Sequence, residues 1–254
     1  MVLLNSKDVN LNALSPTRGT SIDSRVSPWL SALAYPLGSR IILPTYFSEL
    51  SVIGQENIPT QGPVILAPTH RSRWDALVVP HVSGRRVTGR YLRFMVTSDE
   101  VKGLQGWMIR RLGGFPVNPR QPGIASLRYG LELVLAGEML VIFPEGGIFQ
   151  DGQLHPLKPG LARLAVQAES TQPGLGLKVV PIHLQYSELV PQWGCSIHVR
   201  IGTPLDVAAY LHQSPKADAK QLTADLHTAL ERLKAAEALE SLRCQPVPLN
   251  ISRS

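Results

Sequence analysis

The sequence predicts an α/β fold in a single domain, with a mixed, mainly parallel sheet flanked by helices and an apolar helical segment near the N-terminus. Three observations predict it. After Pro63, short runs rich in aliphatic and β-branched residues recur, helical patterns separate several of them, and no change in composition divides the 254 residues into two globular parts. Alternating strands and helices are typical of sheets with parallel neighbours, and a chain of this length can bury one large core.

The N-terminal region divides into two predicted parts. Residues 1–24 are rich in Ser, Asn, Asp and Thr without a sustained period, which predicts a mobile leader. Residues 25–50 contain an apolar run from Pro28 to Phe47 that is too interrupted for a membrane-spanning helix of about 20 residues. The run predicts a bent hairpin of short helices that docks on a membrane. The alternative is that these residues cover one side of the core. The interruptions are Pro36, Gly38, Arg40 and Pro44.

The main domain is expected over 51–245, followed by a tail at 246–254. A proline at its start and Gly137 after its end predict a helix from Pro122 to Ala136, and another helix follows Pro159. Leucines at every fourth position from Leu222 to Leu230 predict an amphipathic helix over 219–242. The predicted strands lie at 63–67, 91–96, 139–143, 178–184 and 196–201.

The charge of the chain favours anionic partners. An excess of 25 Lys and Arg over 19 Asp and Glu gives a formal net charge of +6, which suits phospholipid headgroups, phosphorylated substrates or acidic carrier proteins. Nucleic acid is disfavoured, because aromatic residues make up 6% and no basic tract or known binding module is present. Cys195 and Cys244 offer neither a metal spacing nor a disulfide framework, so no metal site is predicted and a reducing, cytosolic compartment is expected.

A histidine and an aspartate follow the first predicted strand. His70 and Asp75 cannot share a helix face, since five steps of about 100° leave them roughly 140° apart. With His70 in a loop and Asp75 in the next helical turn, however, the carboxylate can fold back onto one ring nitrogen. The other nitrogen is then free to act as a general base. The same spacing also arises by chance, so the pair alone does not establish a site.

A second polar loop follows the strand predicted at 139–143. Glu145 precedes Gly146 and Gly147, which places a carboxylate beside backbone amides that a ligand can approach closely. An ordinary turn with an exposed acid is the alternative. Both polar loops are expected at the same edge of the sheet.

Four motifs in order resemble the glycerolipid acyltransferases typified by bacterial 1-acylglycerol-3-phosphate acyltransferase. Thr69–Asp75 is similar to the Asn-His-x4-Asp motif, with Thr in place of Asn. Gly113–Arg120 approximates the second motif, with a proline before the arginine. Phe143–Gly146 matches the Phe-Pro-Glu-Gly of the third, and Val179–Ile182 the apolar fourth. Pro156–Gly160 resembles the Phe-Lys-x-Gly segment that follows the third motif.

The resemblance implies a function and roles for these residues. An acyl thioester, either acyl-ACP or acyl-CoA, donates a fatty acyl group to the sn-2 hydroxyl of 1-acyl-glycerol-3-phosphate, giving phosphatidic acid in phospholipid biosynthesis. No cofactor is implied beyond this co-substrate. His70 is the general base and Asp75 orients it, Glu145 and Gly146 bind the acceptor, and Arg120 holds its phosphate. Residues 51–245 then form the acyltransferase domain, associated with the cytoplasmic face of a membrane as a peripheral or monotopic protein that meets phospholipid and lysophospholipid.

The chain departs from the family pattern after Gly146. Gly147-Ile148-Phe149 stands where relatives carry Thr-Arg-Ser, which removes a cation near the acceptor. Lys158, Arg71 and Arg73 are candidate substitutes for substrate binding, and solvated surface cations are the alternative for each. Other acceptors, such as glycerol 3-phosphate or another lysolipid, remain open. A hydrolase and a non-catalytic lipid-binding protein also remain open.

Overall fold

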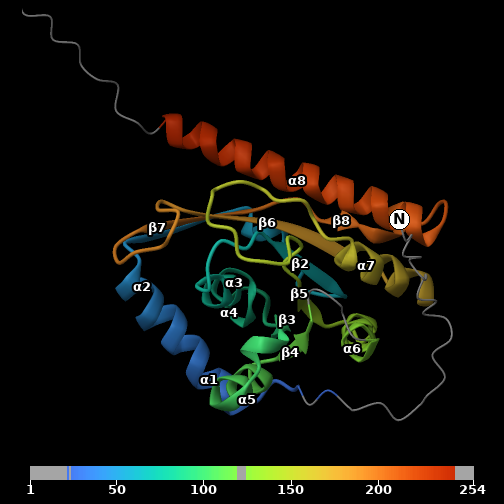
Figure 1. Ribbon diagram of the computed structural model, residues 1–254, viewed down its shortest axis with the longest axis horizontal. Helices are drawn as coiled ribbons and strands as arrows, with labels where there is room; N and C mark the ends of the chain where they lie inside the picture. Colours follow the sequence, from blue (N-terminus) through green and yellow to red (C-terminus); the bar gives the residue numbers. More distant parts are fainter. Residues whose placement is uncertain (1–21, 23, 119–123, 244–254) are drawn as a thin grey trace, which may run out of the picture.

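The computed structural model describes residue 22, residues 24–118 and residues 124–243. The predicted leader, apart from Ile22 and Ser24, lies outside the described residues, and so does the predicted tail. Within the described residues, eight strands form one sheet in the order β1-β7-β6-β2-β5-β3-β4, with β8 paired to β6 (Figure 1). The strands are β1 Glu49–Ile53, β2 Val64–Pro68, β3 Leu92–Thr97, β4 Gly114–Val117, β5 Met139–Val141, β6 Lys178–Tyr186, β7 Ser196–Ile201 and β8 Leu205–Asp206.

The sheet is mixed and mainly parallel, as predicted. The pairs β1–β7, β6–β2, β2–β5, β5–β3 and β3–β4 are parallel. Only β6–β7 and β6–β8 are antiparallel among the strands described. Strands β2 to β6 therefore end at one common edge, which brings the loops that carry His70 and Glu145 together.

Helices cover both faces of the sheet. They are α1 Pro28–Pro36, α2 Leu43–Tyr46, α3 Asp75–Ser83, α4 Arg85–Thr88, α5 Gly103–Arg111, α6 Ile124–Leu135, α7 Gly160–Thr171 and α8 Pro215–Arg243. The π-helical η2 Leu37–Ile42 joins α1 to α2, and single turns form η3 Gln55–Asn57, η4 Ser98–Glu100 and η5 Val207–Tyr210.

The core has one layer on each side of the sheet. Along β2, Ile65 and Ala67 pack with α6, α7 and α8, while Val64 and Leu66 pack with α2 and α3. Successive side chains of a strand point to opposite faces, so a strand buried on both sides reads as a continuous apolar run. This is why the runs after Pro63 predict the central strands well.

The hairpin expected between Pro28 and Phe47 is wrong. Backbone dihedrals remain helical through Pro36 and Leu43, so α1, η2 and α2 follow one another in a single helical rod (Figure 1). A proline removes one helical hydrogen bond, and the wider π-helical turn after Pro36 accommodates that loss without reversing the chain. No helix in the described part of the chain is long and apolar enough to cross a membrane.

The rod has an exposed apolar side and a buried side. Small residues are buried in α1 and η2 (Ser31, Gly38 and Ser39), and Leu43 of α2 is buried in the core. Four large apolar side chains point outward at every fourth position. Their exposed fractions are 65% for Trp29, 63% for Leu33, 45% for Leu37 and 58% for Ile41. We name these four residues the apolar stripe.

Candidate active site

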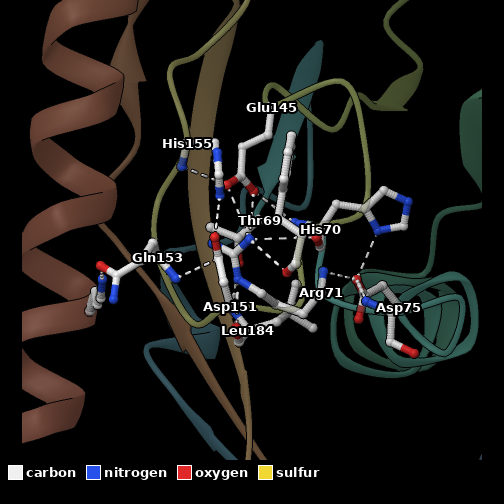
Figure 2. Close-up of polar contacts among 12 residues, drawn as sticks. Thr69, His70, Arg71, Asp75, Glu145, Asp151, Gln153, His155 and Leu184 are labelled. Carbon is white, nitrogen blue, oxygen red and sulfur yellow. Dashed lines mark hydrogen bonds and ion pairs between the residues drawn. The ribbon is translucent and has the colours of Figure 1, made fainter. Parts of the chain in front are cut away.

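His70 lies in the loop between β2 and α3, at the carboxyl end of β2. Its Nδ1 lies 2.9 Å from Oδ2 of Asp75, the first residue of α3 (Figure 2). The carboxylate therefore folds back onto the imidazole, as predicted. The imidazole also stacks on Phe143, with ring centroids 3.9 Å apart. These two contacts set the orientation of the ring, while 19% of its side-chain surface stays exposed.

Asp75 is completely buried, and its carboxylate has four hydrogen-bonding partners, of which His70 is one. Oδ2 accepts hydrogen bonds from the backbone N–H of Arg71 (2.7 Å) and of Ser72 (2.9 Å), and Oδ1 accepts one from the Tyr186 hydroxyl (2.6 Å). Burial and the Asp75 charge raise the pKa of Tyr186 above its usual range, so the hydroxyl keeps its proton and donates. A carboxylate facing Nδ1 favours the tautomer that leaves Nε2 as the base.

Strand β6 holds the start of the loop that carries His70. The N–H of Thr69 donates to the carbonyl of Ile182, and the N–H of Leu184 donates to Oγ1 of Thr69. Each donor–acceptor distance is 2.9 Å. Thr69 is fully buried. The buried Thr69 hydroxyl therefore fixes the loop to β6.

The buried side chain of Glu145 contacts both the loop that carries His70 and its own loop after β5 (Figure 2). Its side chain is fully buried. Its oxygens accept hydrogen bonds from the backbone N–H of His70 and of His155, each with a donor–acceptor distance of 3.0 Å. Nη1 of Arg71 lies 3.1 Å from both oxygens. The Arg71 side chain is only 5% exposed, so this is a buried ion pair. Glu145 thus connects the His70 loop to the loop that contains His155.

A cavity of about 940 Å³ opens beside His70. Its size matches that of ligand-binding pockets, and its walls are largely apolar. Gly146 and Lys158 line it with His70, whereas Asp75 and Glu145 lie behind the lining. Other lining residues include Phe94, Met95, Ile109, Leu112, Leu127 and Leu164.

The remaining predicted site residues have different positions. Gly146 has φ +70°, a left-handed conformation that favours glycine, and a Cβ there would lie 2.6 Å from Cδ of Lys158. The Lys158 side chain therefore lies directly over Gly146. Arg73 is exposed and forms an ion pair with Glu100 at a distance of 2.8 Å. Arg120 lies outside the described residues.

Sequence reasoning missed the internal supports of this site. Arg71 was considered as a cation for substrate, but it is buried against Glu145. Tyr186 was not considered, and Phe143 was named only as part of a motif, although Tyr186 holds Asp75 and Phe143 stacks on His70. No local signal distinguishes these residues, because their partners are far away in the chain.

His183 in β6 is a buried histidine beside the site. Its side chain is 2% exposed, and neither ring nitrogen has a hydrogen-bond partner among the described residues. Burial, followed by the charges of Arg71, Lys234 and Arg200, lowers the pKa of His183 from 6.5 to about 3. The imidazole is therefore neutral at physiological pH.

We expect His183 to make folding stability fall in mild acid. The unfolded chain takes up a proton near pH 6.5, but the folded chain does so only near pH 3, so stability rises with pH across that window. One such proton gives a slope of up to about 1.4 kcal/mol per pH unit. Urea denaturation between pH 4 and 7 should show a shallower slope for His183→Leu than for wild type. Substitution of the exposed His212 by Leu is the control and should leave the slope unchanged; equal slopes for all three proteins would contradict the expectation.

The fold and the site define a class: an α/β domain with a carboxylate-supported histidine at the carboxyl edge of its sheet, beside an apolar cavity. The chain belongs to the Acyltransferase family, whose model matches residues 49–185. The structure of the 1-acyl-sn-glycerophosphate (LPA) acyltransferase PlsC from Thermotoga maritima shares the fold, with a TM-score of 0.62. The likeness covers 86% of this chain and 81% of that chain at 20% sequence identity.

Curated relatives are similar at low identity. A chloroplastic 1-acyl-sn-glycerol-3-phosphate acyltransferase of Brassica napus is 28% identical over 160 residues, which are 61% of this chain and 40% of that protein. The 1-acyl-sn-glycerol-3-phosphate acyltransferase of Bacillus subtilis is 23% identical over 73% of this chain and 88% of its own length. A glycerol-3-phosphate acyltransferase of Alteromonas mediterranea is 29% identical over 56% of this chain. The match covers only 17% of that protein.

Proposed function

We propose that this protein transfers a fatty acyl group from acyl-ACP or acyl-CoA to the sn-2 hydroxyl of 1-acyl-glycerol-3-phosphate, giving phosphatidic acid for phospholipid biosynthesis. The observation that carries the proposal is the His70–Asp75 pair, 2.9 Å apart, at an apolar cavity of about 940 Å³. The Bacillus subtilis relative supports this acceptor, since the match covers most of its length.

The chemistry needs no covalent acyl-enzyme. Nε2 of His70 removes the proton of the acceptor hydroxyl as its oxygen attacks the thioester carbonyl. The tetrahedral intermediate then expels the thiolate, which takes the proton back from the imidazolium. Asp75 keeps the ring in the productive orientation and stabilises the imidazolium, an effect that burial strengthens.

The acceptor phosphate requires a cation at the cavity. Lys158 lines the cavity, and its Nζ lies 3.5 Å from the Gly146 carbonyl. We assign it the role of the arginine that is missing after Gly146, together with Arg120 of the second motif. Glu145 is assigned an indirect role in acceptor binding, because it positions the loops around Gly146 from behind the lining.

The helical rod is proposed as the membrane-docking segment, which places the protein on the cytoplasmic face as a peripheral or monotopic enzyme. Its apolar stripe faces outward along α1 and η2, where serines and glycine face the core, and only the α2 end buries a large apolar residue, Leu43, among the described residues of the rod. A helix packed only against its own domain would show the reverse pattern. An exposed stripe of large apolar residues marks an interaction surface, and a lysophospholipid substrate resides in a bilayer.

A panel of acceptors tests the function. Purified protein in lipid vesicles should form phosphatidic acid from an acyl thioester and lysophosphatidic acid, detected by lipid mass spectrometry, and little product without an acceptor. Parallel reactions with acyl-ACP and acyl-CoA identify the donor.

Each other outcome of the panel has a definite meaning. Product with glycerol 3-phosphate instead would support the acceptor used in the name of the Alteromonas mediterranea relative. Free fatty acid without acceptor would indicate a hydrolase. No product with any combination would overturn the proposal in favour of a lipid-binding role.

A further inference from the structure

Helix α5 presents several large apolar side chains to solvent. Only Gly106 is buried among its nine residues. The exposed fractions are 79% for Leu104, 45% for Trp107 and 46% for Met108. Positions three and four apart lie on one helix face, so these side chains form a single patch, which we name the α5 patch. It adds no packing to the described core, which indicates that it contacts something else.

The C-terminal end of α5 lies next to the start of the helical rod. The N–H of Ser27 donates to the carbonyl of Arg111 at a distance of 2.8 Å, and Val26 forms an isolated antiparallel bridge with Leu112. Figure 1 shows the α1 end of the rod and α5 together at one end of the molecule. The apolar stripe and the α5 patch therefore belong to adjacent elements.

Both elements also flank the cavity that contains His70. The rod contributes Tyr35 and Gly38 to the cavity lining, and α5 contributes Met108 and Ile109. Met108 and Leu77 line the cavity and are also 46% and 37% exposed. They therefore rim an opening, which we name the mouth. Apolar surface continues through the mouth into the apolar cavity, so a fatty chain can pass from a lipid phase without crossing water.

The charges around α5 are mixed at its start and basic at its end. Lys102 precedes the helix and pairs with the exposed Asp99 at a distance of 3.0 Å. The last turn carries Arg110 and Arg111, whose charge suits an anionic lipid surface. The Arg111 guanidinium lies 5.9 Å from the centre of the Trp107 ring. Cations around an apolar face that includes Trp are typical of helices in a membrane interface.

We propose that α5 is a second membrane-contacting element. Together with the helical rod, it holds the mouth of the cavity against an anionic bilayer. The acyl chain of a lipid substrate then enters the cavity directly from the bilayer. The use of this entrance rests on the proposed function, whereas the contact between α5 and lipid is independent of catalysis.

Vesicle binding of the full chain tests the contact. The variant Leu104→Ser/Trp107→Ser changes the patch but leaves the cavity lining intact. It should bind vesicles of phosphatidylcholine and phosphatidylglycerol about tenfold more weakly or worse than wild type in co-sedimentation, because it loses two large apolar side chains. The control is Leu239→Ser, which changes another exposed leucine (61%) on α8, away from the patch, and should bind as wild type does. Trp107 emission, taken as wild type minus Trp107→Phe, should be quenched by brominated lipids.

Three outcomes would overturn the proposal. They are unchanged vesicle binding of the double variant, no quenching of Trp107, or a change in oligomeric state of the double variant without vesicles, which would make a second copy the occupant. Acyl transfer to a short-chain, water-soluble acceptor separates this result from a failure of the proposed function. The double variant should match wild type in that assay, and inactivity of both proteins would count against the function only.

Discussion

A His70→Ala variant is expected to lose acyl transfer by about 10²–10⁴-fold in kcat, the usual contribution of a positioned general base. Without the imidazole, no group at this position can take the hydroxyl proton as the thioester is attacked. Asp75 lies behind the cavity lining and does not replace it. Initial rates with saturating thioester and lysophosphatidic acid measure the loss, and circular dichroism with thermal unfolding checks that the variant is folded.

A matched pair of variants separates the base from its support. Tyr186→Phe removes the hydrogen bond to Oδ1 of Asp75 but keeps the contact between His70 and Oδ2, so it should cost less than about tenfold. Asp75→Asn removes the charge that stabilises the imidazolium and should cost more than Tyr186→Phe. If His70→Ala retained a tenth of the wild-type rate, the general-base mechanism would be wrong.

Substitution of Glu145 by leucine is expected to lower the free energy of unfolding by about 3–5 kcal/mol, because it leaves the Arg71 charge buried without its partner. Arg71→Met should cost a similar amount for the same reason. The double variant Arg71→Met/Glu145→Leu should recover part of this loss, since no buried charge then remains. The backbone N–H groups of His70 and His155 still lose their acceptor, which costs roughly 1–3 kcal/mol each.

Urea denaturation of wild type, both single variants and the double variant gives the coupling energy between the two side chains. The expected coupling is large and of a sign that makes the double variant more stable than the sum of the single effects. Additive effects would show that the ion pair does not hold the two loops together. The single variants should also lose acyl transfer, since the loop that carries His70 is then less well positioned.

Sequence patterns predict the long and buried elements well. Helix α8 was expected over 219–242 and spans Pro215–Arg243, because its leucine stripe repeats over many turns. The central strands were found because they are buried on both faces and form continuous apolar runs. Strands β1, β4 and β8 were missed. Strand β4 has four residues, including a glycine and a proline, and its strand conformation depends on pairing with β3.

The candidate site was only partly predictable for a similar reason. His70 and Asp75 could be paired because they are five residues apart and a loop-to-helix turn brings them together. Burial of Arg71 against Glu145, 74 positions later, could not be inferred, because an arginine beside a loop histidine has the same local pattern in a core as on a surface. The direction of the apolar stripe was equally invisible, since periodicity identifies two faces of a helix without saying which faces the protein.

The amino-acid pattern alone predicts the α/β class, the central strands, helix α8, and the spacing that lets Asp75 orient His70. These properties depend on short-range periodicity and on chain geometry within a few residues. Three features emerge only when the chain is folded: Glu145 connects two loops from behind the cavity lining, an apolar cavity opens beside His70, and the rod and α5 present apolar faces next to the mouth of the cavity. Burial, ion pairing and cavity shape arise from contacts between segments that are distant in the chain, so no local pattern encodes them.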